Sequence, residues 1–347
     1  MEYRNLGRTG LSVSAICLGT MTWGSQNSED EGHAQIACAL DRGVNFIDTA
    51  EMYPVTPSLP ETRGRTEEIV GSWFAANGGR DKVVLATKVM GPFWMEPIRG
   101  GNNRLDRRNI ELAVDASLKR LQTDYIDLYQ LHWPDRTVPK FGGRGLTALA
   151  EDAGATPIEE TLDALAGLVQ AGKVRHVGVS NETPWGVAQF LKHAEAKGLP
   201  RIASIQNAYN LLNRLFEGGL SEFALREDVG LLAYSPLAAG HLSGKYMGGV
   251  IPKGSRLDVA RQFTRYDTPP QPDATARYVA IAHAFGLDPV QMALAFVNDR
   301  PFVTADIIGA TSVEQLRTAI DSIDLKLSDE VLAAIETVHR LYPDPCP

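Results

Sequence analysis

Four side chains that together could transfer a proton lie at or near the ends of short apolar segments. Asp48, Lys88 and His132 each end such a segment, and Tyr53 follows Asp48 by five residues. A phenol titrates near about 10, which makes it a weak proton donor at neutral pH. A neighbouring ammonium lowers that pKa by stabilising the phenolate, and a carboxylate can hold the ammonium in place. An imidazole beside the phenol can orient a substrate oxygen or share the proton.

Each of these residues also has an ordinary structural explanation. Asp48 could cap a turn, and Tyr53 could be a half-buried aromatic side chain. Lys88 could extend into solvent, and His132 could be a hydrogen-bonded histidine at a strand end. These explanations weaken if one fold brings all four side chains together. We therefore interpret the four as an acid–base group.

The elements that must position them are short β-branched segments alternating with longer helical stretches. Apolar residues at spacings of three and four predict helices over 110–121 and 158–169, and Ser328 is placed to cap a helix over 328–340. Glycines that suit helix ends follow several helical stretches, namely Gly43, Gly172, Gly198 and Gly286. The predicted strands are 15–19, 45–48, 83–88, 126–132, 176–180, 202–206, 231–234 and 306–309.

This alternation of eight strand–helix units predicts an α/β fold, a (β/α)8 TIM barrel. No composition break divides residues 1–347, so we expect a single domain, opened by a β-hairpin around 7–10. A doubly wound dehydrogenase would show G-x-G-x-x-G after its first strand, whereas 19–24 reads Gly-Thr-Met-Thr-Trp-Gly. The loops after the strands are long, and in a barrel they gather at the C-terminal face: 54–65, 90–107, 133–157 and 237–272.

Composition limits the partners. The net charge of −8 favours neither a nucleic-acid nor an anionic-membrane partner. Three cysteines without CxxC spacing suit a reducing compartment, and we expect Cys346 to be exposed. The charged residues 1–4 lack the apolar region of a signal peptide, and no apolar run approaches about 20 residues. We therefore expect a cytoplasmic protein; the sequence does not indicate its oligomeric state.

Five segments, in order along the chain, are similar to signatures of one enzyme family. They cover residues 43–53, 64–67, 85–89, 124–134 and 172–181, and include Gly43-Val44-Asn45-Phe46-Ile47-Asp48 and Leu131-His132-Trp133-Pro134. These signatures resemble those of the aldo-keto reductases. Among the subfamilies, the chain looks most like bacterial reductases related to the potassium-channel beta subunits.

The resemblance implies NADPH-dependent reduction of an aldehyde or ketone to the alcohol. It makes Tyr53 the proton donor, Lys88 and Asp48 its tuning pair, and His132 the group that orients the substrate. Tyr234 would stack on the nicotinamide, and its carboxamide would meet Ser180, Asn181 and Gln206. The remaining expected cofactor contacts are Gly19, Thr20, Met21, Asp48, Ser235, Pro236, Leu237, Gly240, Lys245, Arg256, Gly309, Thr311 and Gln315.

One position departs from the family pattern. Ala319 stands where many members have an asparagine that contacts the adenine, so adenine binding would depend on Gln315, backbone groups or stacking. The sequence alone therefore does not establish how strictly NADPH is preferred over NADH. Substrate contacts are expected from aromatic side chains and the acid–base group: Trp23, Tyr53, Trp94, His132 and Trp133, near Phe141.

Two other functions remain open. The chain could be a regulatory subunit that binds NADPH and reports redox state to a partner, because the related channel subunits keep the same four residues. A metal-dependent barrel hydrolase would need several histidines or carboxylates at strand ends. Only Asp48 and His132 qualify, with Lys88 between them, so we expect no metal site.

Overall fold

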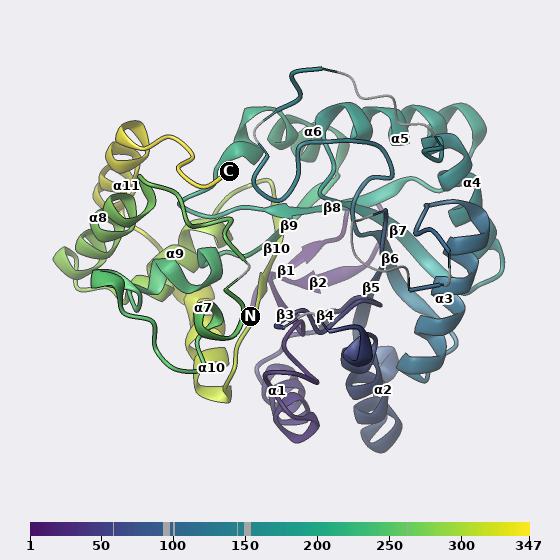
Figure 1. Cartoon of the computed structure of the whole chain (residues 1–347), viewed down its shortest axis with the longest axis horizontal. Helices are drawn as coiled ribbons and strands as arrows, with labels where there is room; N and C mark the ends of the chain where they lie inside the picture. The colour runs from purple at the N-terminus through teal and green to yellow at the C-terminus, as the bar shows by residue number, and fades with distance from the viewer. Residues whose placement is uncertain (58, 93–97, 100, 144, 149–153, 262) are drawn as a thin grey trace.

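A closed barrel of eight parallel strands forms the centre of the computed structural model, which describes residues 1–57, 59–92, 98–99, 101–143, 145–148, 154–261 and 263–347. The barrel strands run in the order β10-β3-β4-β5-β6-β7-β8-β9 (Figure 1). The predicted TIM barrel is confirmed. The strands span β3 Ile16–Gly19, β4 Phe46–Asp48, β5 Val84–Val89, β6 Ile126–Leu131, β7 Val174–Ser180, β8 Ile202–Ala208, β9 Gly230–Tyr234 and β10 Val303–Ile308.

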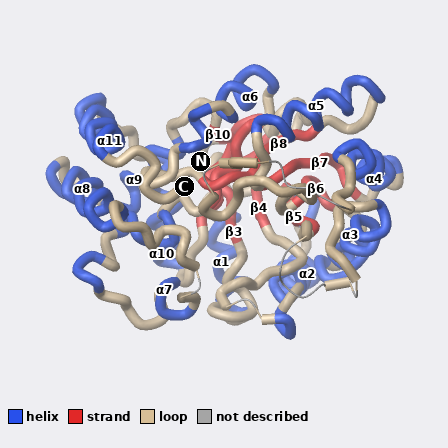
Figure 2. The backbone as a smooth tube through the Cα atoms, turned by 45° about the horizontal axis from the view of Figure 1, so that its top comes forward, coloured by secondary structure: helices blue, strands red, loops and turns tan. Residues whose placement is uncertain are grey.

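Helices surround the strands (Figure 2). Side-chain caps begin several of them: Ser28 forms a capping box with Glu31 on α1, and Ser328 caps α11 as expected. The glycines expected at helix ends all have a positive φ there: Gly43, Gly172, Gly198 and Gly286. The helices are α1 Glu29–Asp41, α2 Arg65–Asn77, α3 Arg107–Leu121, α4 Ile158–Gln170, α5 Pro184–Lys197, α6 Leu220–Glu227, α7 Arg256–Val259, α8 Gln271–Ala284, α9 Pro289–Asn298, α10 Val313–Asp321 and α11 Asp329–Leu341.

In the described part of the chain, no single helix is both long and apolar enough to cross a membrane. Helices α8 and α9 meet the length and composition criteria only as a pair, and that pair is bent by 98°.

Apolar side chains fill the barrel and leave one end for polar groups. The predicted hairpin forms from β1 (Tyr3–Asn5) and β2 (Ser12–Ser14). Leu6, which follows β1, and Val13 of β2 pack with interior residues such as Phe46 and Leu232. A larger core fills the space between the strands and the helices. Parallel strands covered on both faces in this way are apolar almost throughout. Polar side chains on the strands therefore stand out, and they concentrate toward the C-terminal ends.

Candidate active site

The four residues of the predicted acid–base group meet at the C-terminal end of the barrel. Asp48 ends β4, Lys88 lies near the end of β5, and His132 follows β6. The Lys88 Nζ donates to Asp48 Oδ2 at 2.5 Å and to the backbone oxygen of Thr49 at 2.8 Å. The same nitrogen lies 3.4 Å from the Tyr53 hydroxyl. The rings of Tyr53 and His132 meet edge to face with centroids 5.7 Å apart. The structure therefore brings all four side chains together at one place.

Burial sets the charge states of this group. Burial raises the pKa of Tyr53, and the Lys88 ammonium offsets only part of that rise. Burial by itself lowers the pKa of Lys88, but the Asp48 carboxylate raises it above its usual value. Burial and the Lys88 charge hold the pKa of His132 well below its usual value. At neutral pH the site therefore combines a protonated phenol, a charged ammonium and a neutral imidazole. Lys88 lowers the pKa of Tyr53 as expected, but desolvation, which the sequence does not show, raises it by more.

The other oxygen of Asp48 accepts two amide hydrogen bonds. Gln206 Nε2 donates to Asp48 Oδ1 at 2.9 Å, and Gln130 Nε2 donates to the same oxygen at 3.1 Å. Gln130 was not among the predicted site residues. The sequence could have indicated it, because Gln130 lies two residues before His132 and side chains two apart on a strand share a face.

The residues expected to hold the nicotinamide form one hydrogen-bonded shelf. The Ser180 hydroxyl donates to the backbone oxygen of Gln206 at 2.7 Å. Asn181, with φ of 53°, donates from Nδ2 to the backbone oxygen of His132 at 2.9 Å. The Tyr234 hydroxyl donates to Asn181 Oδ1 at 2.7 Å. The structure thus brings this predicted set together and ties it to the acid–base group.

Residues around the first strand pack closely beside this shelf. A Cβ on Gly19 would lie 3.0 Å from the backbone oxygen of Ile308, so only glycine fits without displacement. The Thr20 hydroxyl donates to the backbone oxygen of Asp48 at 2.9 Å. Gly309, after β10, has open space where a Cβ would stand.

The segment expected to close over the pyrophosphate follows β9. Residues 235–237 form a turn that enters a 3-10 helix at Ala238–Ser243. Gly240 has φ of 95°, and a Cβ there would come within 2.9 Å of the Lys245 Nζ. Lys245 is exposed and lies near the Tyr246 ring, 5.2 Å from its centroid.

At the start of α10, Gln315 Oε1 accepts hydrogen bonds from the backbone N–H and the hydroxyl of Thr311, both at 3.1 Å. Ser312 caps the helix. Ala319 is 4% exposed and packs in the main core, so the structure also offers no adenine contact from that side chain.

Arg256 has no carboxylate partner among the described residues. Its Nη1 contacts the Met21 sulfur at 3.3 Å, and its guanidinium packs on the Phe263 ring at 4.6 Å. The buried Nε has no hydrogen-bond partner in the described part of the chain. Burial lowers the pKa of this arginine. A desolvated cation with unused donors matches an anionic ligand group.

The tryptophans expected to contact the substrate differ in where they lie. Trp23 is fully buried in the main core, with its indole N–H directed at Gln35 Oε1 at 3.4 Å, so it does not reach the barrel mouth. That expectation is corrected. Trp133 packs against His132, with ring centroids 4.8 Å apart, and near Phe141 at 5.8 Å. Trp94 lies outside the described residues.

Two further polar contacts at the mouth were not predicted. Arg265 Nη1 donates to the Tyr234 hydroxyl at 2.8 Å. Arg99 pairs with Glu51 at 2.5 Å, and Glu51 accepts from the backbone N–H of Met90 at 2.6 Å. Both arginines lie in long loops, where sequence alone gives no contact partner.

Comparison with known proteins agrees with this geometry. A model of the aldo/keto reductase family matches residues 15–340. The chain belongs to the aldo-keto reductase family. Protein tas of Escherichia coli K12 is 51% identical over the full length of both chains. A probable voltage-gated potassium channel subunit beta of Arabidopsis thaliana is 32% identical, over 99% of this chain and 98% of the relative. L-glyceraldehyde 3-phosphate reductase of Escherichia coli K12 is 31% identical, over 97% and 92%. The protein is therefore an oxidoreductase.

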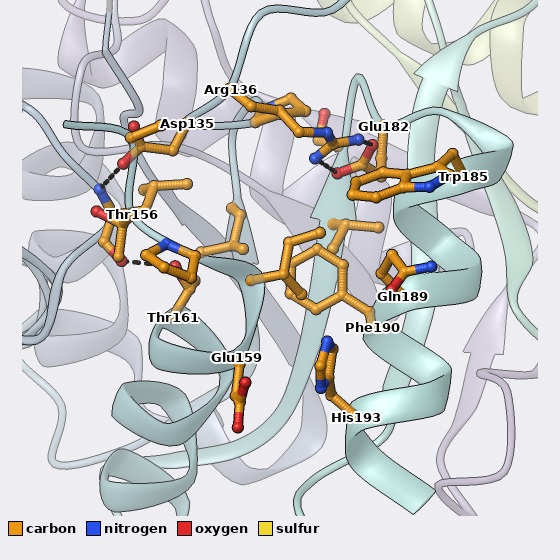
Figure 3. Close-up of a pocket in the computed structure, with 18 residues that line it drawn as sticks. Asp135, Arg136, Thr156, Glu159, Thr161, Glu182, Trp185, Gln189, Phe190 and His193 are labelled. Carbon is orange, nitrogen blue, oxygen red and sulfur yellow. Dashed lines mark hydrogen bonds and ion pairs between the residues drawn. The ribbon is translucent and has the colours of Figure 1, made fainter. Parts of the chain in front are cut away.

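Away from the barrel mouth, this reductase has a cavity of about 280 Å³ between α4 and α5 (Figure 3). Of the predicted site residues that the structure describes, Ser180 alone is among its lining residues. Figure 3 shows Arg136 and Glu182 facing each other beside Trp185, and they form an ion pair there. These two charges therefore neutralise each other within the cavity lining. In the described part of the chain, no three His, Cys, Asp or Glu side chains are grouped to hold a metal.

Proposed function

We propose that this reductase transfers hydride from NADPH to an aldehyde or ketone, with Tyr53 donating the proton to the carbonyl oxygen. The observation that carries the proposal is the contact of the Tyr53 hydroxyl with Lys88 Nζ at 3.4 Å, within a buried Lys88–Asp48 ion pair. The ammonium stabilises the phenolate left after proton donation. The neutral imidazole of His132 orients the carbonyl oxygen without a competing charge.

NADPH is the cofactor that the surrounding residues suit. Ser180, Asn181 and Gln206 offer amide and hydroxyl groups for its carboxamide, and Tyr234 offers an aromatic face for the ring. Arg256, whose Nε has no hydrogen-bond partner among the described residues, supports a phosphate contact. Bound there, NADPH supplies the hydride.

Loss of NADPH absorbance in the presence of 4-nitrobenzaldehyde or methylglyoxal tests the proposal. We expect turnover well above background, and a collapse of kcat in Tyr53→Phe with NADPH binding retained. Turnover unchanged in Tyr53→Phe would contradict the assigned role. An Arg256→Ala variant should bind NADPH at least about tenfold more weakly, because a charge-assisted hydrogen bond is worth roughly 1.5–3 kcal/mol.

A second candidate is a regulatory subunit that binds NADPH and reports redox state to a partner. The likeness to a protein named as a potassium channel subunit beta favours it. The acid–base group does not distinguish the two functions, since it fits both. NADPH binding without turnover across a broad panel of aldehydes and ketones would favour the sensor, whereas Tyr53-dependent turnover favours the reductase.

A further inference from the structure

A buried amide joins the two halves of the site inside the barrel. Gln130 of β6 is fully buried and lies between Asp48 of β4 and Gln206 of β8. The strand between β6 and β8 has Gly178 at the paired position, and a Cβ there would lie 3.3 Å from Gln130 Cγ. The absence of a side chain on β7 leaves room for the Gln130 amide to reach across the barrel.

The charge of Asp48 determines which way both amides face. An ionised carboxylate only accepts hydrogen bonds, so the amide nitrogens of Gln130 and Gln206 must face it. Gln206 Nε2 also donates to Gln130 Oε1 at 3.1 Å, which uses its second N–H. Gln206 Oε1 then remains as an acceptor, and it receives no hydrogen bond from the described residues. The orientation of Gln206 therefore follows from its neighbours.

We propose that Gln130 is a positioning residue that couples the acid–base group to the cofactor shelf. Through Asp48 Oδ1 it helps hold the carboxylate whose other oxygen binds Lys88. Through its own Oε1 it holds Gln206 with an acceptor presented to the carboxamide N–H of the nicotinamide. This inference rests on the proposed function, because it assigns Gln206 to that carboxamide.

A Gln130→Leu variant removes both hydrogen bonds while keeping a similar volume. We expect kcat/KM for 4-nitrobenzaldehyde to fall about 10–100-fold, because a hydrogen bond to a charged group is lost. Binding of NADP+ and of its 3-acetylpyridine analogue, measured by calorimetry, gives a readout independent of turnover. The analogue lacks the carboxamide N–H, so wild-type protein should prefer NADP+ about tenfold. Gln130→Leu should reduce that preference more than about twofold, because Gln206 then keeps only its hydrogen bond to Asp48.

A Gln130→Glu variant adds a test that a packing role alone would not pass. A protonated glutamic acid at this position can donate to Asp48 and accept from Gln206, whereas the carboxylate can only accept. We expect its kcat/KM to approach the wild-type value at low pH and to fall as pH rises, while the wild-type profile stays flat over the same range. The titratable groups around the position are the same in both proteins, namely Cys17, Asp48, Tyr53, Lys88 and His132.

Ser204→Ala is the matched control, because Ser204 is a buried interior residue of β8 whose hydroxyl has no partner among the described residues. Its kcat/KM and cofactor preference should stay within twofold of wild type. If Gln130→Leu and Gln130→Glu behave like this control while wild type reduces carbonyls, the inference is overturned and the proposed function stands. If wild type binds NADP+ but reduces no carbonyl, the proposed function fails, and the cofactor preference still tests Gln130.

Discussion

Removing the buried ammonium should affect stability and catalysis to different extents. In Lys88→Met, the ammonium that bonds Asp48 at 2.5 Å and approaches the Tyr53 hydroxyl at 3.4 Å is lost. Leaving Asp48 as an unpaired buried carboxylate costs about 3–5 kcal/mol of stability. An ammonium 3.4 Å from a phenolate contributes at most about 5 kcal/mol at an effective dielectric constant near 20. Because the charge is only partly developed in the transition state, we expect kcat/KM to fall about 10²–10³-fold.

The double variant Asp48→Asn/Lys88→Met separates the two effects. The Asp48→Asn substitution keeps an acceptor for Gln130 and Gln206 but removes the charge, so most of the lost stability should return. Urea unfolding of the wild type, both single variants and the double variant measures this coupling. Catalysis should remain about 10²-fold or more below wild type, because the ammonium beside the Tyr53 hydroxyl is missing. If the double variant regains kcat/KM to within tenfold of wild type, Lys88 serves only to neutralise Asp48, and our account of Tyr53 is wrong.

Three further predictions concern other sites. Burial raises the pKa of Asp306 well above its usual value, so the wild-type protein loses stability as pH rises above about 4. Asp306→Asn should therefore gain about 1.4 kcal/mol of stability relative to wild type per pH unit in that range, measured by unfolding at pH 5 and pH 8. The lowered pKa of His132 should leave kcat/KM without an inflection near pH 6.5, whereas stability should fall below that pH as the unfolded imidazole takes up a proton; an inflection there would show a charged ring. Gly71→Ala places a Cβ 2.3 Å from the backbone oxygen of Arg120 and should cost about 1–3 kcal/mol in thermal unfolding, while Gly101→Ala, with open space, should be neutral.

The strands were predictable because their signal is local. Each predicted strand overlaps an observed one, and the polar residues at strand ends converge because parallel strands in a barrel share one C-terminal face. Strand order and strand ends were therefore sufficient to predict that the four residues of the acid–base group lie together. The roles of its members and of the cofactor contacts stay predictions until they are measured.

What the sequence did not predict depends on packing between distant segments. Trp23 follows strand β3, which predicts a place at the barrel mouth, yet its indole packs against α1. A Cβ on Gly32 of that helix would lie 3.1 Å from the indole. Cys346 was expected to be exposed, but its backbone N–H donates to Leu212 at 3.0 Å and the side chain is fully buried. Leu212 is distant from Cys346 in sequence, so no local pattern could indicate that burial.

The site's chemistry is a property of the closed barrel and not of any one strand. Asp48 receives hydrogen bonds from Lys88, Gln130 and Gln206, which lie 40, 82 and 158 residues further along the chain on β5, β6 and β8. Removing any one of these donors leaves the buried carboxylate less well compensated, which costs stability. The hydrogen bond from Gln206 Nε2 to Gln130 Oε1 leaves Gln206 Oε1 as an acceptor, and the hydrogen bond from Lys88 Nζ to Asp48 Oδ2 holds Lys88 in place. The closed barrel therefore joins the acid–base group and the predicted cofactor shelf in one hydrogen-bonded network, and we expect a substitution at any of the three donors to disturb both.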